Sequence, residues 1–353
     1  MNKLVSFYPG PSEIYPQVPS FVQDAYNAGI LSINHRSAMF EEMFGETVAL
    51  LKSKLHIPEA YAIFFTSSAT ECWEIIAQSL VERQTTHIYN GAFGEKWWQY
   101  TQKIKPLALG ISFDENEEIP YDHISPNTEI ICLTQNETSN GTQVSNAKIK
   151  AIKEKYPQML LAVDATSSMA GINLDINQAD LWFASVQKCF GLPAGLGVMI
   201  CSPRAVEKGL AIQENLHYNS FPFIIGMTAK NQTAYTPNVL GIYLLNRVLQ
   251  MVPDIKEVDI KIKDRYRRYI HFFEESTQLD LHIHEPATRS HTVLVLEGEQ
   301  DQITTLKKEA KKVGIQLGNG YGKYAHITLR IANFPAIGDR DVDKLLQFFS
   351  GKR

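Results

Sequence analysis

The chain has 353 residues, of which 44% are hydrophobic and 10% aromatic, and its formal net charge is -4 with both signs interspersed. This length exceeds one ordinary domain, so we expect two domains, with enough apolar residues for a large core. The charge argues against a broad nucleic-acid or anionic-membrane surface, and no apolar run reaches membrane-spanning length.

The four cysteines are Cys72, Cys132, Cys189 and Cys201; they form no CxxC pair, and three of them lie in apolar runs. That favours buried free thiols in a reducing compartment over disulfides or metal ligands. The N-terminus, MNKLVSFYPGPSE, has no sustained apolar segment of signal-peptide type. We therefore expect a cytoplasmic protein with no metal site and with neither nucleic acid nor membrane as a partner.

The first part of the chain alternates helices and strands. Pro9-Gly10-Pro11 predicts a turn, and Ser37 fits the N-cap of a helix with apolar residues at helical spacing. Short apolar runs bounded by turn signals predict buried strands at 61–65, 87–89, 129–133, 160–163, 181–186 and 197–201. Helices between these strands predict a mostly parallel sheet with right-handed crossovers.

After Cys201 the alternation changes. Helices are expected at 204–210, 238–251, 258–277, 303–314 and 341–351, and strands at 291–298 and 326–333. This tail predicts a separate, smaller α+β domain. We expect an N-terminal arm at 1–15, a large domain at 16–240, and a long connecting helix with a small C-terminal domain at 241–353.

Two charged residues follow strands of the predicted sheet. The run Leu160–Val163 ends in Asp164, and the run Leu181–Val186 leads to Lys188. Ligands of open α/β sheets bind at the carboxyl ends of strands, so this acid and this amine can face one ligand. Pyridoxal phosphate (PLP) needs an amine as covalent anchor and a carboxylate at its ring nitrogen. Taken singly, each residue is more often a capping aspartate or a surface lysine.

Two further segments fit a phosphate-bearing aromatic cofactor. The run Thr66–Thr70 joins a strand to a helix N-terminus, where backbone N–H groups and hydroxyls can bind a phosphate. Serine and threonine caps also occur without a ligand. Phe93 lies between small residues after a strand, which is unusual for core packing and leaves a stacking role open.

This constellation resembles the class V group of fold-type I PLP-dependent aminotransferases, from Pro9-Gly10-Pro11 to Arg330. Its strongest part is the strand ending in Asp164 followed by Ser185-Val186-Gln187-Lys188. The resemblance implies a fold-type I α/β architecture: a large domain with a mostly parallel sheet flanked by helices, plus a smaller C-terminal α+β domain. It implies Lys188 as covalent anchor and general base, and Asp164 as the partner of the pyridine nitrogen.

The resemblance also implies roles for other cofactor-binding residues. It places Ser68, Ala69 and Thr70 in the phosphate-binding segment, Phe93 on the ring face, Thr138 beside the phenolic oxygen and Gln187 near the phosphate. Thr233 and Thr236 match the segment that contacts the phosphate from the partner subunit. A homodimer with shared active sites follows from that resemblance.

The candidate substrate-binding residues match the family's pattern only in part. Arg330 matches the arginine that binds the substrate α-carboxylate. His35-Arg36-Ser37 resembles the His-Arg-Ser of phosphoserine aminotransferases, whose arginine binds a phosphate or the glutamate side chain. Those enzymes also carry a His-Arg pair shortly before the carboxylate arginine. This chain lacks it, and Lys323 or His326 are the cationic candidates in its place.

The reaction expected from this resemblance is transamination of 3-phosphohydroxypyruvate by L-glutamate, which gives O-phospho-L-serine and 2-oxoglutarate in serine biosynthesis. Transfer between alanine or serine and glyoxylate or pyruvate is the alternative. Cysteine desulfuration is disfavoured, because Cys189 directly follows the lysine. A non-catalytic PLP-fold binding protein would lack Lys188, Asp164 or Arg330, and all three are present.

Overall fold

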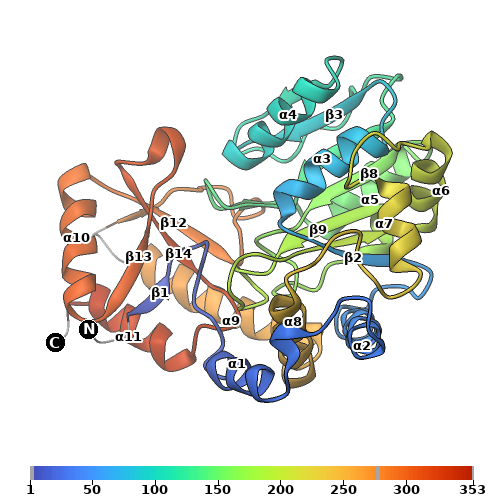
Figure 1. Ribbon diagram of the computed structural model, residues 1–353. Coiled ribbons are helices and arrows are strands. Elements are labelled where there is room, and N and C mark those ends of the chain that lie inside the picture. Colours follow the sequence, from blue (N-terminus) through green and yellow to red (C-terminus); the bar gives the residue numbers. More distant parts are fainter. Residues whose placement is uncertain (1–3, 276–278, 352–353) are drawn as a thin grey trace.

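The computed structural model describes residues 4–275 and 279–351, which are arranged around two main sheets (Figure 1). The larger sheet has seven strands in the order β2-β10-β9-β8-β5-β3-β4. Its strands are β2 (Ala62–Thr66), β3 (Thr85–Tyr89), β4 (Leu109–Ser112), β5 (Ile130–Thr134), β8 (Leu160–Asp164), β9 (Leu181–Ser185) and β10 (Gly197–Cys201). The strand predictions between 61 and 201 all correspond to strands of this sheet.

The sheet is mostly parallel, as expected. Only β10 runs antiparallel to its two neighbours, β2 and β9. The carboxyl ends of β2, β9, β8, β5 and β3 therefore lie at one edge. Gly197 begins β10 at that edge opposite Thr66 and Ser185, and a Cβ there would lie 2.3 Å from Thr66 Oγ1. The missing side chain allows this close approach of strands.

Helices cover both faces of the larger sheet. Successive residues of each strand alternate between two cores: Leu181 and Phe183 join one, and Trp182 and Ala184 join the other. The first core is shared with α3 (Ala69–Ser79), α4 (Ala92–Ile104), α6 (Pro203–Ile212) and α7 (Phe221–Thr228). The second is shared with α1 (Val18–Asn27), α2 (Ala38–Leu55), α5 (Asn146–Lys155) and α8 (Val239–Met251).

The smaller sheet joins the two ends of the chain (Figure 1). Helix α9 (Ile255–Glu274) leads to it, and its strand order is β1-β13-β14-β12-β11. The strands are β1 (Val5–Phe7), β11 (Asp280–Leu281), β12 (Val293–Glu297), β13 (Ile315–Asn319) and β14 (Thr328–Ala332), with helices α10 (Gln300–Lys312) and α11 (Asp339–Phe349). The end of the helix predicted at 258–277 lies outside the described residues.

Strand β1 pairs in parallel with β13, so the N-terminal segment belongs to the smaller sheet. The boundaries 1–15, 16–240 and 241–353 stay a prediction. The remaining elements are the hairpin β6 (Asn136–Glu137) and β7 (Thr142–Gln143), and the 3₁₀ turns η1 (Ile30–Ser32), η2 (Ile176–Gln178) and η3 (Gly322–Tyr324). All four cysteines are buried free thiols, as expected.

Local signals account for several helix starts. Ser37 is the N-cap of α2, as predicted, and its hydroxyl accepts a hydrogen bond from the Phe40 N–H at 3.3 Å. Ser68, Ser145 and Ser202 cap α3, α5 and α6 in the same way. Within 4–275 and 279–351, no helix combines the length and apolar character needed to cross a membrane.

The fold predicts that the N-terminal segment contributes to stability. Phe7 of β1 is 0% exposed in the smaller core, so Phe7→Ala should lower the free energy of unfolding by about 3–5 kcal/mol. Denaturant unfolding followed by circular dichroism measures this loss. Leu216→Ala, at a side chain that is 88% exposed, is the control and should stay within about 0.5 kcal/mol of wild type. Equal midpoints for both variants would contradict the packing of β1.

Candidate active site

A cavity of about 390 Å³ opens at the edge where the parallel strands end. Asp164 is the last residue of β8, and Lys188 follows the end of β9. The cavity brings together eight of the predicted site residues: Ala69, Thr70, Phe93, Thr138, Asp164, Gln187, Lys188 and Arg330. They come from segments spread over most of the chain, and the strand ends are what gathers them.

Lys188 is buried, with 7% of its surface exposed. Its Nζ donates hydrogen bonds to Thr138 Oγ1 and to Ser167 Oγ, both at 2.9 Å. Burial lowers the pKa of this amine to about 8, although the negative charges of Asp164 and Glu137 oppose the shift. The neutral form is therefore far more populated near physiological pH than in an ordinary lysine, and a neutral amine can act as nucleophile and as proton acceptor.

Asp164 is a buried carboxyl group held by two donors. The indole Nε1 of Trp73 donates to Oδ2 at 3.2 Å, and the Thr166 N–H donates to Oδ1 at 2.9 Å. Burial raises the pKa of Asp164, while the bonds from Thr166 and the charge of Lys188 act in the opposite direction. A carboxylate with so little water around it is a strong acceptor for a cationic ring nitrogen.

Phe93 lies in the first turn of α4 and contacts the amine. Lys188 Nζ lies 5.3 Å from the centroid of its ring. The start of α4 is held by the buried carboxylate of Glu137, which accepts the N–H groups of Phe93 and Gly94 at 3.1 and 3.0 Å. A Cβ at Gly91 would lie 2.3 Å from Glu137 Cγ, so only glycine leaves room for this contact.

Arg330 lies on β14 of the smaller sheet and reaches the cavity. Its Nη1 donates to the backbone oxygen of Thr138 at 2.8 Å, and its Nε donates to that of Asn319 at 2.6 Å. These two bonds fix the plane of the guanidinium beside the cavity. Burial lowers the pKa of Arg330, and its guanidinium remains a cation.

The sequence reasoning did not assign a site role to several residues that line the cavity, among them Tyr8, Trp73, Lys96 and Tyr321. Two of them had a signal, since Lys96 follows Phe93 by three residues and Trp73 follows Thr70 by three, which places each pair on one helix face. The Lys96 amine donates to the Tyr321 hydroxyl at 2.6 Å. Tyr8 and Tyr321 lie on irregular segments, where spacing gives no such signal.

The predicted turn Pro9-Gly10-Pro11 lies against Lys188. The Ser12 N–H donates to the Gln187 backbone oxygen at 3.1 Å. A Cβ at Gly10 would come within 2.8 Å of Lys188 Cε, and the φ of Gly10 is +146°. Both observations require glycine at this position.

Seven of the predicted site residues lie outside the cavity. Ser68 caps α3, and Thr236 is exposed. The Thr233 hydroxyl donates to the Tyr235 backbone oxygen at 2.5 Å. Arg36 is exposed next to His35, and its Nη1 donates to Gln232 Oε1 at 2.6 Å, which places 35–36 beside 232–236.

Lys323 and His326 lie in the connection between β13 and β14. Lys323 lines a second cavity, of about 430 Å³, which shares Tyr321 with the first. His326 is exposed and lines neither of these two cavities. The roles predicted for all seven residues outside the cavity stay predictions.

The cavity fits an anionic aromatic cofactor with an aldehyde. It offers an amine, a buried acid, an aromatic ring and the N-terminus of α3. It also has buried acceptor or hydroxyl oxygens without a hydrogen-bond partner: Asn136 Oδ1, Thr134 Oγ1 and Gln187 Oε1. Buried polar atoms of this kind are expected where a ligand completes their hydrogen bonding.

Comparison with known proteins gives the family. The model of the family "Aminotransferase class-V" matches residues 7–320. The chain belongs to the class V aminotransferases. A phosphoserine aminotransferase of Rhodococcus opacus (strain B4) is 24% identical over 348 residues, covering 95% of this chain and 91% of that protein.

Solved structures agree with this assignment. The crystal structure of a phosphoserine aminotransferase from Cytophaga hutchinsonii ATCC 33406 superposes with a TM-score of 0.94 at 33% identity, covering 100% of this chain and 99% of that one. An aspartate aminotransferase from Thermus thermophilus has a TM-score of 0.86 at 19% identity, covering 99% and 98% of the two chains. The fold is the fold-type I aminotransferase fold, as expected.

The protein is thus a PLP-dependent aminotransferase that acts on small amino and keto acids. When bound, PLP supplies an electron sink for the substrate carbon that loses its proton. The amine of Lys188 can take up and return that proton, since burial holds its pKa near 8. The guanidinium of Arg330 can orient a carboxylate beside it.

The geometry predicts which lysine binds PLP covalently. After reduction of the PLP-loaded protein with borohydride, mass spectrometry of its peptides should find the pyridoxyl group on Lys188. The Lys188→Ala variant should lose the label, because the amine at the strand end is removed. Lys96→Ala, at the other lysine that lines the cavity, whose amine donates to the Tyr321 hydroxyl, should keep it. Label on Lys96 in the wild-type protein or in Lys188→Ala would contradict the assignment.

Proposed function

We propose that the protein transfers the amino group of L-glutamate to 3-phosphohydroxypyruvate, giving O-phospho-L-serine and 2-oxoglutarate, as a step of serine biosynthesis. The observation that carries this proposal is the charge of the cavity. Apart from the anchor Lys188, its lining includes two cationic side chains, Lys96 and Arg330, and one carboxylate, Asp164, which is assigned to the ring nitrogen. Such a cavity favours substrates with two anionic groups, and these four compounds all carry them.

The names of the relatives support the same reaction. The proteins from Rhodococcus opacus and Cytophaga hutchinsonii are both named phosphoserine aminotransferase. Similarity extends over at least 95% of this chain in both cases, so the whole site is compared. We carry their substrates over to this chain as part of the proposal.

The proposal assigns each cavity residue a task. Lys188 anchors PLP and moves the proton, Asp164 pairs with the ring nitrogen, and Phe93 covers the ring. The Thr138 hydroxyl accepts a hydrogen bond from Lys188 Nζ at 2.9 Å, and its backbone oxygen accepts one from Arg330. Thr138 therefore connects the lysine that anchors PLP to the arginine that binds the carboxylate. At the phosphate end of the substrate, Lys96 is better placed than Lys323 or His326, because Lys96 lines the cavity.

The proposal includes a homodimer with shared sites. Thr233, Thr236, His35 and Arg36 lie outside the cavity of their own chain, and Arg36 donates to Gln232, which precedes Thr233. In a dimer, these residues of one copy would complete the cavity of the other. Thr233 and Thr236 would then contact the phosphate of PLP, and Arg36 the anionic end of the substrate.

The substrate pair can be tested by half-reactions. L-Glutamate should convert the PLP form and abolish its visible absorbance, and 3-phosphohydroxypyruvate should restore it. We expect glyoxylate and pyruvate to restore it at least about tenfold more slowly, since each lacks the second anionic group. The measurement is the rate of recovery at equal keto-acid concentrations. Faster recovery with glyoxylate or pyruvate than with 3-phosphohydroxypyruvate would contradict the proposed substrate.

A second prediction concerns Arg36. The Arg36→Ala variant should raise KM for 3-phosphohydroxypyruvate by about 10- to 100-fold, because charge-assisted hydrogen bonds of about 1.5–3 kcal/mol are lost. KM for L-alanine, which has no second anionic group, should change by less than about twofold. Steady-state kinetics measures both constants, and Arg83→Ala at an exposed arginine is the control. Equal effects on the two substrates would count against a phosphate-binding Arg36.

A further inference from the structure

Tyr321 connects three parts of the active site. Its ring stacks on that of Phe93 with 5.1 Å between centroids and an interplanar angle of 28°. Its hydroxyl accepts the hydrogen bond of Lys96, and the guanidinium of Arg330 lies 5.3 Å from its ring centroid. If Tyr321 moves, the packing against both Phe93 and Arg330 therefore changes at the same time.

Tyr321 belongs to a short connection, 320–327, between β13 and β14, and this loop is internally bonded. The Tyr324 N–H donates to the Tyr321 backbone oxygen at 3.1 Å, and the Thr328 hydroxyl donates to that of Tyr324 at 2.7 Å. At Gly320, a Cβ would lie 2.5 Å from the Tyr324 oxygen. The loop is thus packed on itself, and the position of Tyr324 determines that of Tyr321.

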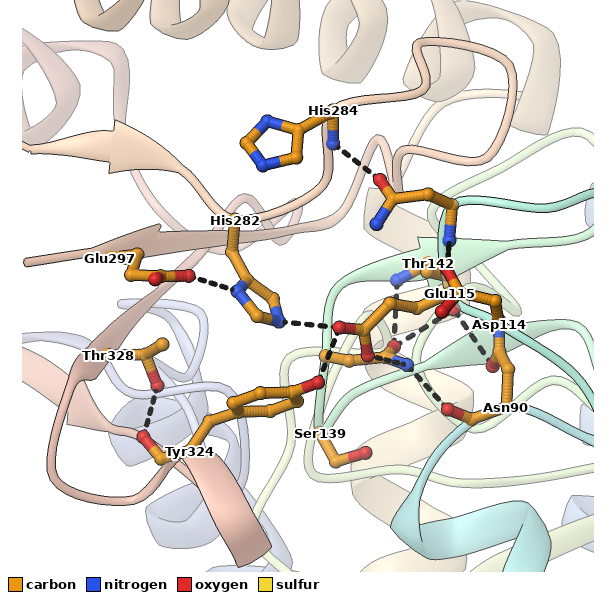
Figure 2. A network of polar contacts seen from close by, with 12 residues as sticks. Asn90, Asp114, Glu115, Ser139, Thr142, His282, His284, Glu297, Tyr324 and Thr328 are labelled. Carbon is orange, nitrogen blue, oxygen red and sulfur yellow. Dashed lines mark hydrogen bonds and ion pairs between the residues drawn. The ribbon is translucent and has the colours of Figure 1, made fainter.

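Tyr324 is in turn held by Glu115, which comes from the loop after β4 of the larger sheet (Figure 2). The Tyr324 hydroxyl donates to Glu115 Oε1 at 2.5 Å. The backbone oxygen of Glu115 accepts the Thr288 hydroxyl at 3.1 Å, and Asn140 Nδ2 lies 3.5 Å from Oε2. Glu115 therefore joins a loop of the larger sheet to segments next to the smaller one.

His282 pairs with this carboxylate and with a second one, as Figure 2 shows. Its Nε2 lies 3.2 Å from Glu115 Oε1, and its Nδ1 lies 2.7 Å from Glu297 Oε2. The ring of Tyr324 packs against the imidazole at 4.3 Å between centroids. His282 is 5% exposed, so two carboxylates share one buried imidazole between them.

We propose that Glu115 and His282 are positioning residues for transamination, which hold the 320–327 loop so that Tyr321 stays packed on Phe93 and Arg330. Neither residue lines the active-site cavity, although Glu115 lines the second cavity that shares Tyr321 with it, and both act through Tyr324 and Tyr321. The proposal rests on the transaminase activity and not on the phosphorylated substrate. We refer to Glu115, His282, Glu297 and Tyr324 as the clasp.

The charge of the clasp depends on pH. Burial lowers the pKa of His282, but Glu115 and Glu297 outweigh it, so this pKa lies above the ordinary value of 6.5. The pKa of Glu115 is lowered by His282 and Tyr324, with a smaller contribution from Lys323, against the effect of its burial. Because the pKa of His282 is raised, the ion pairs of protonated His282 with Glu115 and Glu297 are fully formed below about pH 6.5. These ion pairs are lost as the pH rises through the folded-state pKa of His282.

The test combines kinetics with proteolysis. In His282→Gln and in Glu115→Gln, KM for the amino donor should rise about fivefold, while kcat changes by less than about twofold. The donor is whichever amino acid the wild-type protein converts, so failure with glutamate would count against the proposed substrate and leave this test intact. Trypsin should also cleave after the exposed Lys323 about threefold faster, because the loop opens more often.

A double-mutant cycle and a matched control separate positioning from general destabilisation. In a Tyr321→Leu background, His282→Gln should add no further rise in KM, because both changes act through the same ring. His271→Gln, at an exposed histidine 3.4 Å from Glu275, should match wild type in every readout. Wild-type KM should also rise between about pH 6 and about pH 9, and more steeply than in His282→Gln.

Three results would overturn the proposal. One is an unchanged KM and unchanged cleavage after Lys323 in both clasp variants. The second is a full fivefold effect of His282→Gln in the Tyr321→Leu background, which would show that the clasp acts elsewhere. The third is an identical pH dependence of KM in wild type and His282→Gln. If His282→Gln does not fold, Glu115→Gln decides the question by KM, by cleavage after Lys323 and by the same cycle in the Tyr321→Leu background.

Discussion

The active site depends on burying one amine at the carboxyl edge of a parallel sheet. Lys188 has two hydroxyl partners, Thr138 and Ser167, and the described residues, 4–275 and 279–351, give it no ion pair within 4.0 Å. Hydroxyls accept a hydrogen bond from the amine without strongly favouring its charged form, so desolvation dominates and the pKa falls. A close carboxylate would have kept the lysine protonated and unreactive.

The rest of the cavity is assembled from both sheets around that amine. Asp164 and Lys188 come from the larger sheet, and Arg330 comes from the smaller one. Strand β1 pairs with β13, and the turn that follows β1 brings Gly10 against Lys188. The N-terminal segment therefore ties the two sheets together at the point where cofactor and substrate meet. This explains why residues from distant parts of the sequence form one cavity.

Periodicity and turn signals in the sequence were sufficient to predict six of the seven strands of the larger sheet. The short apolar runs that end in Asp164 and lead to Lys188 are strands of this sheet, and the helices between the strands indicated that it is mostly parallel. The strand β4 was missed, because Leu109–Ser112 is mostly exposed and lacks the apolar signal of the central strands. Strand β13 was missed as well, since Ile315–Asn319 contains two exposed polar residues and ends in a glycine-rich loop.

The sequence predicted those cavity residues whose side-chain type is itself required by the chemistry of PLP. A lysine, an aspartate and an arginine at strand positions have few substitutes in PLP chemistry, so sequence reasoning found them. Glu137 and Tyr321 have more general roles, holding a helix end and packing against a ring, and only the folded contacts reveal them. The role predicted for the exposed Arg36 rests on the proposed dimer, because Arg36 does not line the cavity of its own chain.

The central claim, a buried amine of lowered pKa, is tested most directly by titrating Lys188 in the cofactor-free protein. The rate at which acetic anhydride modifies Lys188 is measured by mass spectrometry over a range of pH, relative to the exposed Lys230. We predict a midpoint at about pH 8 for Lys188. A midpoint at the ordinary lysine value of 10.5 would contradict the account.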